Sequence, residues 1–272
     1  MKKAIVLSTP DAAFNALSFK GSLSEGIEQA SKLGYDGVEI AIRDPKMVDV
    51  SEIKEIAYKN NINIVAIGTG QAYNQEGLYM TSSSEEVRKK TIERLYSQID
   101  FAANFGAHLI IGLIRGSIKD MPYEKGVDLF LEGLKDIGEY AKEKEIKVVI
   151  EPINRYELNF INNVAEAMPI LNRINLENVG LLLDTFHMNI EEPIIEESIK
   201  QAGDYILHFH IADSNRWPPG YGHLNFESIF AALFSTGYDG YISGEMLPKP
   251  SSLESMKKTI EYLNEISKKL HI

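Results

Sequence analysis

Three carboxylates and one histidine lie at or near the ends of four successive apolar runs in the second half of the chain: Glu151, Asp184, His210 and Glu245. Carboxylates gathered without partners repel one another and raise each other's pKa. A divalent cation bound among them removes that repulsion. Three oxygen ligands and one imidazole nitrogen, with no thiolate, suit Mn²⁺, Mg²⁺ or Co²⁺. The four residues therefore indicate a metal site, provided that the fold brings the ends of these runs together.

The elements that must do this are eight short runs rich in Ile, Val or Leu, typical of buried parallel strands, which alternate with longer amphipathic stretches. The runs are AIVLS (4–8), GVEIAIR (37–43), INIVAIGT (62–69), HLIIGLI (108–114), IKVVIE (146–151), VGLLLD (179–184), ILHFHIA (206–212) and GYISGE (240–245). Strict alternation of strand and helix predicts a parallel sheet with right-handed crossovers. Eight units in this length predict an α/β fold of the closed (β/α)8, or TIM, barrel type, as a single domain over 1–272. An open doubly wound sheet is the alternative, weakened because STPDAAF after the first run is no Gly-rich phosphate loop.

Two amphipathic stretches carry start and stop signals for helices. The stretch 82–106 opens with Ser82 and Glu85, spaced as in a capping box, and ends at Gly106. The stretch 22–34 has the same pair of signals. We expect each helix to be capped by its first serine and to end at its glycine.

A barrel explains why the run ILHFHIA carries two histidines. The carboxyl ends of barrel strands meet at one rim, where barrel enzymes have their active sites. Residues i and i+2 of a strand share a face. His208 and His210 are therefore expected to point toward the barrel axis, with His210 at the rim and His208 one layer deeper. Glu39 points inward by the same rule, and we expect it to be a buried structural partner.

Four segments resemble the sugar phosphate isomerase/epimerase family, whose members have a xylose-isomerase-like barrel. They are EPINRYE (151–157), DTFHMN (184–189), HFHIADSNRWPPGYGHLNF (208–226) and SGEM (243–246). Within the family they resemble the ketose 3-epimerases. The resemblance covers nearly the whole chain.

This resemblance implies that the four rim residues bind one divalent metal ion, with Mn²⁺ as the first expectation and Co²⁺ or Mg²⁺ as alternatives. It implies that Glu157, His187 and Arg216 bind the substrate. The implied reaction inverts the carbon next to a ketone, C3 of a ketose, through a cis-enediolate. One base cannot easily remove a proton and return one to the opposite face. We therefore expect Glu151 and Glu245, on strands separated by two others, to act as the acid–base pair.

Two further segments, STPDAAFNALSFKG and AIGTGQAY, resemble a narrower group, the epimerases that act on 5-keto-L-gluconate in bacterial inositol breakdown. This implies 5-keto-L-gluconate and D-tagaturonate as the substrate pair, with a neutral ketohexose of the D-tagatose or D-allulose type as the alternative. A keto acid needs a cation for its carboxylate. Arg43, Arg115 and Arg155 are the candidates, and the opposing interpretation is that each pairs with a local acid such as Asp44.

The composition limits the partners. A net charge of −11 argues against a nucleic-acid partner, and the absence of Cys excludes disulfides, Cys-based zinc sites and a catalytic thiol. No run approaches the ~18 to 20 apolar residues that span a bilayer, and the first apolar run is too short for a signal peptide. We expect a cytoplasmic protein that acts on a small keto sugar or keto sugar acid, without nucleic-acid or membrane partners. The resemblance implies a homodimer or homotetramer.

Three other functions fit part of the pattern. A metal-dependent endonuclease on the same type of barrel would need more histidines at strand ends and a basic face, and neither is visible. An aldose–ketose isomerase would move a proton between C1 and C2 instead of inverting C3. A sugar-binding barrel without activity would be expected to have lost a ligand or a base, and all four rim residues are present.

Overall fold

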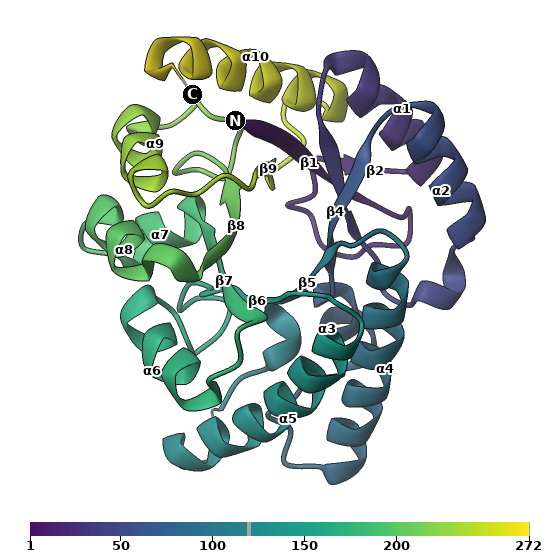
Figure 1. Ribbon diagram of the computed structural model, residues 1–272, viewed down its shortest axis with the longest axis vertical. Helices are drawn as coiled ribbons and strands as arrows, with labels where there is room; N and C mark the ends of the chain where they lie inside the picture. Colours follow the sequence, from purple (N-terminus) through teal and green to yellow (C-terminus); the bar gives the residue numbers. More distant parts are fainter. Residues whose placement is uncertain (119–120, 272) are drawn as a thin grey trace.

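Eight parallel strands form a closed ring in this computed structural model, which describes residues 1–118 and 121–271 (Figure 1). The ring is closed because the first strand pairs with the last, Ala4 lying opposite Ser243. The strands are β1 (Lys2–Ser8), β3 (Gly37–Ala41), β4 (Asn63–Gly68), β5 (His108–Ile111), β6 (Val148–Ile150), β7 (Val179–Asp184), β8 (Ile206–Ile211) and β9 (Tyr241–Gly244). A two-residue strand, β2 (Phe19–Lys20), adds to β1 outside the ring. The predicted TIM barrel is confirmed, and closure excludes the open doubly wound sheet.

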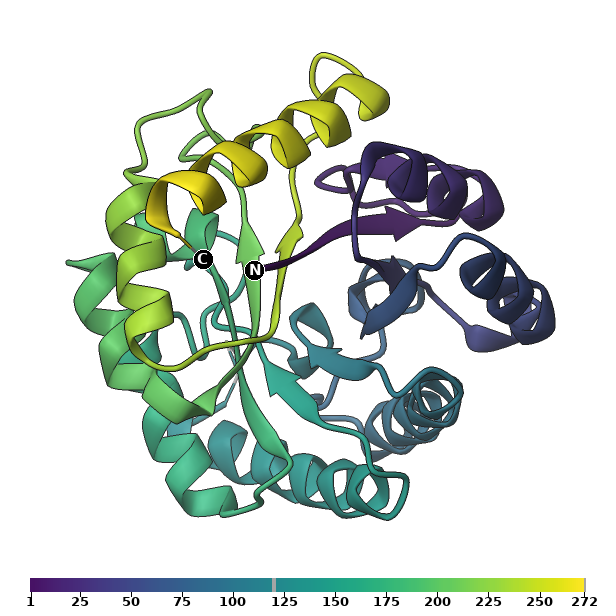
Figure 2. The same ribbon diagram turned by 45° about the horizontal axis from the view of Figure 1, so that its top comes forward.

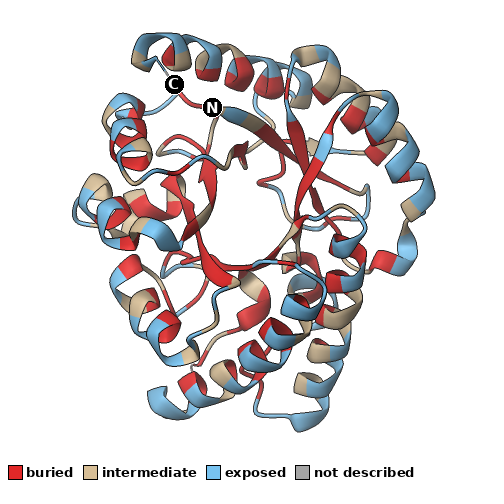
Figure 3. Cartoon of the chain, viewed as in Figure 1, coloured by how far each residue is buried: buried red, intermediate tan, exposed pale blue. Residues whose placement is uncertain are grey.

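Helices surround the ring and turn their apolar faces toward it, so burial alternates along each helix (Figure 3). The helices are α1 (Leu23–Leu33), α2 (Val50–Lys59), α3 (Gly70–Glu76), α4 (Glu85–Ala103), α5 (Tyr123–Glu143), α6 (Val164–Ile174), α7 (Thr185–Glu191), α8 (Ile195–Ala202), α9 (Phe226–Ser235) and α10 (Ser252–Leu270). The last helix, α10, packs against both α9 and α1 and completes the outer layer (Figure 2). No helix in the described part of the chain is both long and apolar enough to cross a membrane.

The predicted helix signals are partly correct. The helix α1 ends at Gly34, whose φ of +89° is the left-handed conformation that glycine adopts easily. Ser22 is the N-cap of α1, but its hydroxyl makes no capping hydrogen bond, so that part of the expectation is wrong. The start of α4 was expected at Ser82, and this is also wrong. Ser84 is the N-cap, and its hydroxyl accepts a hydrogen bond from Val87 N, whereas the Ser82 hydroxyl accepts one from Ser84 N. The sequence contains three successive serines, and the backbone conformation at the start of α4 determines which of them is the N-cap.

Apolar side chains fill the barrel below its carboxyl-terminal rim. Val149 and Leu182 lie two residues before Glu151 and Asp184, and therefore share their inward face. They pack with Ala4, Val65, Ala66 and Ile110 in one buried cluster. This packed apolar layer lies directly below the polar groups of the rim.

Candidate metal centre

Strand register brings the four predicted metal ligands together at the carboxyl-terminal rim. Asp184, the last residue of β7, lies directly opposite His210 of β8, and His210 lies opposite Ser243 of β9. Glu245 follows β9 by one residue, on the same face as Ser243, and Glu151 directly follows β6. One ligand atom from each of Glu151, Asp184, His210 and Glu245 lies within 4.8 Å of the other three.

Several atoms of this group are buried without a hydrogen-bond partner. They are Oε1 of Glu151, Oδ2 of Asp184 and Nδ1 of His210. His210 Nδ1 lies 3.9 Å from Glu151 Oε1 and 4.0 Å from Glu245 Oε2, too far for a direct hydrogen bond. Buried polar atoms are normally paired. Unpaired atoms that converge on one point therefore fit a divalent cation bound among them.

The carboxylates of the group are held with pKa values above their ordinary range. Burial raises the pKa of Glu151 well above normal, and the neighbouring Glu245 raises it further. Burial is also the main cause that raises the pKa of Asp184, and it raises the pKa of Glu245 to about 7. The group without a metal therefore retains protons near neutral pH, and a bound cation would replace them.

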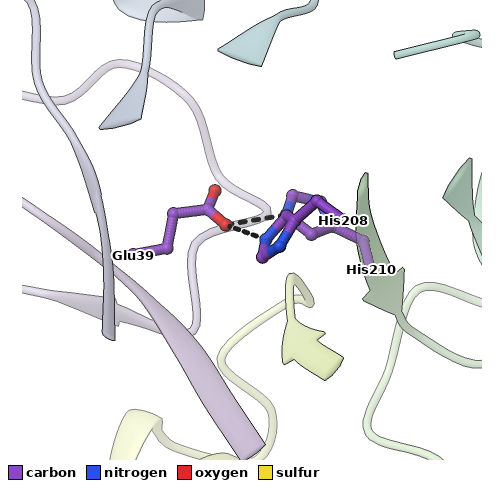
Figure 4. A group of neighbouring side chains, drawn as sticks. All are labelled: Glu39, His208 and His210. Carbon is purple, nitrogen blue, oxygen red and sulfur yellow. Dashed lines mark hydrogen bonds and ion pairs between the residues drawn. The ribbon is translucent and has the colours of Figure 1, made fainter. Parts of the chain in front are cut away.

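Glu39 fixes which nitrogen of His210 faces this group (Figure 4). Glu39 Oε2 lies 2.8 Å from His210 Nε2 and 3.0 Å from His208 Nε2, and all three residues are buried. Burial alone would lower the pKa of His210, but Glu39 raises it to about 10, and the two histidines keep the pKa of Glu39 well below its usual range. Glu39 is thus an anion that accepts from Nε2–H, which leaves Nδ1 for the rim.

Glu39, His208 and His210 are themselves close enough to hold an ion. The two short contacts in this inner trio are hydrogen bonds that already pair Glu39 Oε2 with both Nε2 atoms. The outer group has unpaired ligand atoms instead. The outer group is therefore the better metal site, and the expectation that Glu39 is a buried structural partner agrees with its contacts.

His187, in the first turn of α7, presents a neutral N–H to the cavity. Its Nδ1 lies 3.4 Å from the backbone N of Asn154 and 2.7 Å from the Asn154 side-chain amide nitrogen, and both are donors. Nδ1 is therefore an acceptor, and the ring proton is on Nε2, 3.8 Å from Glu151 Oε1 and 4.0 Å from Asp184 Oδ2. Burial, with Arg216 nearby, holds the pKa of His187 well below its usual range, so the ring stays neutral.

Arg216 reaches over the same cavity from the loop after β8. Its guanidinium donates to Glu157 Oε1 at 3.0 Å and to Glu245 Oε2 at 3.1 Å. It lies against two aromatic rings, with its Cζ atom 5.0 Å from the ring centre of Phe14 and 4.6 Å from that of Phe186. Its Nε is buried and has no partner. A donor held this firmly and left unpaired can bind an oxygen atom of a ligand.

The loop that carries Arg216 is organised by Asp213. The Asp213 carboxylate accepts hydrogen bonds from the backbone N–H groups of Ser214, Gly220 and Leu224. Arg216 itself has a φ of +61°, a strained conformation for a residue with a side chain. The backbone of Arg216 is therefore held in an unfavourable conformation, and this conformation directs the guanidinium into the cavity.

The cavity above these groups has two unlike halves. The half formed by β6 to β9 holds the charged groups described above. The second half, formed by β1, β3, β4 and β5, has one charged lining residue, Glu39, whose carboxylate is hydrogen-bonded to His208 and His210. The other residues that line it are uncharged: Phe14, Leu17, Ala41, Gly68, Thr69, Gly70, Gln71, Asn74, Ile110, Gly112 and Leu113. Among the described residues that line this second half, none is Lys or Arg.

Arg115 does not reach the cavity, although it was a candidate to hold a substrate carboxylate. Its side chain is 0% exposed and donates to four backbone carbonyls. These belong to Gly112, Glu151, Phe160 and Ile161. Arg115 ties the chain after β5 to the loop after β6, and the hypothesis that it holds substrate is wrong.

Arg43 and Arg155 are also engaged outside the cavity lining. Arg43 Nε lies 3.3 Å from Asp11 Oδ2 and 3.8 Å from Glu76 Oε1. Arg155 pairs with Glu191 through both its Nε and its terminal nitrogen, and its side chain is 60% exposed. Each pairs with an acid, as the opposing interpretation expected.

The structure adds residues that the sequence patterns did not single out. Asn154 donates to Glu157 at 3.0 Å and faces His187, so one amide holds two of the predicted substrate-binding residues. Phe14 and Phe186 both pack against the guanidinium of Arg216. The segments EPINRYE and DTFHMN contain Asn154 and Phe186, but only the folded chain reveals their contacts.

Comparison with known proteins finds relatives that have the same type of barrel. A sequence model of the xylose isomerase-like TIM barrel family matches residues 27–266. L-ribulose 3-epimerase from Methylomonas sp. (strain DH-1) is 32% identical over 81% of this chain and 77% of its own, and D-psicose 3-epimerase from Agrobacterium fabrum is 32% identical over 82% and 78%. The crystal structure of D-allulose 3-epimerase from Methylomonas sp. in complex with D-allulose superposes with a TM-score of 0.83 at 27% identity, covering 97% of this chain and 98% of that one.

The raised pKa values predict that metal affinity depends on pH. A carboxylate must lose its proton to bind a cation, so a Glu245 with a pKa of about 7 favours binding above pH 7 and opposes it below. Between pH 8 and pH 6 this residue alone should weaken the affinity for Mn²⁺ about tenfold. Calorimetric titration of metal-free protein with Mn²⁺ at both pH values measures this. Equal affinities would mean that these carboxylates are not the ligands.

Removing the Glu39 carboxylate should weaken the same site without destroying it. In Glu39→Gln, the charge that holds Nε2–H of His210 is lost, and an outer partner of this kind typically contributes 10- to 100-fold to metal affinity. The dissociation constant for Mn²⁺ should rise by about that factor, while saturating Mn²⁺ should still give full occupancy. An unchanged dissociation constant would show that Glu39 does not orient His210.

Proposed function

Since the chain belongs to the xylose isomerase-like TIM barrel family, we propose that it is a sugar epimerase that inverts the carbon next to the ketone of an open-chain keto sugar. One observation carries the proposal. Glu151 and Glu245 approach the same buried point from β6 and from β9, with the strands β7 and β8 between them. Two carboxylates that flank one substrate are what proton removal on one face and delivery on the other require.

We propose that Glu151, Asp184, His210 and Glu245 hold one divalent cation, with Mn²⁺ first and Co²⁺ or Mg²⁺ as alternatives. The unpaired ligand atoms and the oxygen-rich donor set support this assignment. When bound, such a cation polarises the carbonyl group of a keto sugar as a Lewis acid and makes the neighbouring proton more acidic.

The two glutamates exchange a proton with C3 of the substrate in this proposal. One carboxylate takes the proton from C3, which gives a cis-enediolate, and the other carboxyl group delivers a proton to the opposite face. The configuration of the substrate decides which glutamate acts first. Arg216 donates to Glu245 at 3.1 Å and so restrains the orientation of one of the two.

His187 and Arg216 bind substrate oxygens in this proposal. The Nε2–H of His187 and the unpaired Nε–H of Arg216 are donors held in place on the charged side of the cavity. They suit the oxygens on C1 and C2, where negative charge develops as the C3 proton leaves. Glu157 accepts hydrogen bonds from Asn154 and Arg216, and its role is to keep both in position.

For the substrate we propose a neutral ketose first. The curated relatives support this, because they are named as 3-epimerases of L-ribulose and D-psicose. The second half of the cavity supports it too, since a carboxylate there would meet the anionic Glu39 and no Lys or Arg among the described lining residues. The pair 5-keto-L-gluconate and D-tagaturonate is the second candidate, favoured by the likeness of STPDAAFNALSFKG and AIGTGQAY.

A role in inositol breakdown follows only from that second candidate. The single domain over 1–272, the homodimer or homotetramer and the cytoplasmic location stay predictions.

Glu151→Gln and Glu245→Gln should each abolish epimerisation. An amide keeps the shape of the side chain but cannot accept the proton, and losing a general base lowers kcat by ~10² to 10⁴. NMR in D₂O, with each variant saturated with Mn²⁺ and its metal content measured, follows both inversion and exchange at C3. If either metal-loaded variant kept more than about a tenth of the wild-type kcat, the two-base scheme would fail.

Arg43→Ala and Arg155→Ala should leave kcat/KM within about twofold of wild type on both D-tagatose and D-tagaturonate, because both side chains are paired with acids outside the cavity lining. The wild type should have the higher kcat/KM on the neutral sugar. A selective loss on D-tagaturonate in either variant, or a wild type that prefers the acid, would favour the keto-acid assignment.

A further inference from the structure

Apart from Glu39, the second half of the cavity, formed by β1, β3, β4 and β5, is lined by uncharged residues, and a buried polar atom of one of them has no hydrogen-bond partner. Gln71, in the first turn of α3, is 3% exposed and lines the cavity. Its Nε2 donates to the backbone carbonyl of Ala41 at 2.7 Å. That bond fixes the orientation of the amide, and its Oε1 is buried with no hydrogen-bond partner.

The neighbouring Gln98 shows what is distinctive about Gln71. Gln98, in α4, is 0% exposed, donates through Nε2 to the carbonyl of Ile42 at 3.3 Å, and also has an unpaired Oε1. Gln98 does not line the cavity, whereas Gln71 does. The chain thus has two similar buried amides at the end of one strand, and only one can meet a ligand.

The surroundings of Gln71 indicate what that ligand group is. Thr69 donates its hydroxyl hydrogen to the carbonyl of Ile110 at 2.6 Å, so its oxygen can only accept a further bond. Gln71 Oε1 is an acceptor by nature. Two acceptors in an apolar wall suit a group that donates, such as a sugar hydroxyl.

We propose that Gln71 is a specificity-determining residue, whose Oε1 accepts a hydrogen bond from a hydroxyl on C5 or C6 of the substrate. The inference rests on the proposed function, in which C1 to C3 of the substrate lie in the charged half of the cavity. The remaining carbons of the substrate then lie in the half that contains Gln71. A site built to bind a substrate hydroxyl discriminates against analogues that lack it, because its buried acceptor then stays unpaired.

The test compares two substrates of different length. D-fructose has C5 and C6, whereas D-erythrulose ends at C4 but still has a C3 next to its ketone. Gln71→Leu should lower kcat/KM for C3 exchange of D-fructose roughly five- to tenfold, as expected for one lost hydrogen bond, mainly through KM. The same variant should change kcat/KM for D-erythrulose less than twofold. Ratios of variant to wild type cancel the different open-chain fractions of the two sugars.

Gln98→Leu is the matched control, since it removes the same kind of buried amide outside the cavity. Its ratio of D-fructose to D-erythrulose activity should equal that of wild type. If Gln71→Leu folds poorly, the wild type alone still provides a test with 5-deoxy- and 6-deoxy-D-fructose. One of the two analogues should then lose a similar factor in kcat/KM.

Equal losses on both sugars in Gln71→Leu would mean that Gln71 only supports the fold. No loss on D-fructose, or undiminished wild-type activity on both deoxy sugars, would also overturn the inference while the proposed function stands. A Mn²⁺-loaded wild type that exchanges the C3 proton of D-tagaturonate but of none of these sugars would overturn this inference alone, and one that exchanges none of them would overturn both.

Discussion

Mutual repulsion among three carboxylates, two buried and one half-buried, is the constraint on which the rest of this structure depends. Glu151 and Asp184 are buried beside His210 at one rim of the barrel, Glu245 is half-buried there, and loss of solvation raises the pKa of each. Such a group is tolerable only if protons or a cation compensate its charge. The rigid barrel holds the carboxylates together, and Glu39 holds the imidazole that faces them. The same constraint thus accounts for both the raised pKa values and the unpaired ligand atoms.

The barrel and the ligand group were predictable because both follow from strand register. Alternation of apolar runs predicted the strands, and the two-residue period of a strand predicted that Asp184 and His210 share the inner face. In the structure they lie directly opposite each other. The inward direction of Glu39 came from the same rule, and its contacts agree with it.

Other features depend on contacts between segments far apart in the chain, which no local pattern reveals. Arg115 lies four residues after the end of the barrel strand β5, near the rim where substrate-binding residues are expected, yet it is buried against four carbonyls. Gln71 and Gln98 make similar hydrogen bonds, and only Gln71, at the start of α3, lines the cavity. Ser82 is buried before the helix begins, whereas the exposed Ser84 caps it, and the run of three serines in the sequence does not show which one has this position.

The two halves of the cavity have different roles in the proposed function: one half carries out proton transfer, and the other binds the rest of the substrate. Apart from Glu39, which is hydrogen-bonded to His208 and His210, the charged residues lie on the side of β6 to β9, where protons must move. The side of β1 to β5 offers apolar walls and neutral amides. Arg216 joins the halves, because it lies against Phe14 from the first loop while it donates to Glu245 from the last strand.

The most direct test of the central claim measures metal content and C3 proton exchange in the same sample. Chelated protein is titrated with Mn²⁺ in D₂O while exchange in a ketose is followed by NMR. The account predicts no exchange without metal and full exchange at one equivalent of Mn²⁺ per chain, the capacity of the outer group. Exchange by protein shown by elemental analysis to be metal-free, or a requirement for two equivalents per chain, would contradict it.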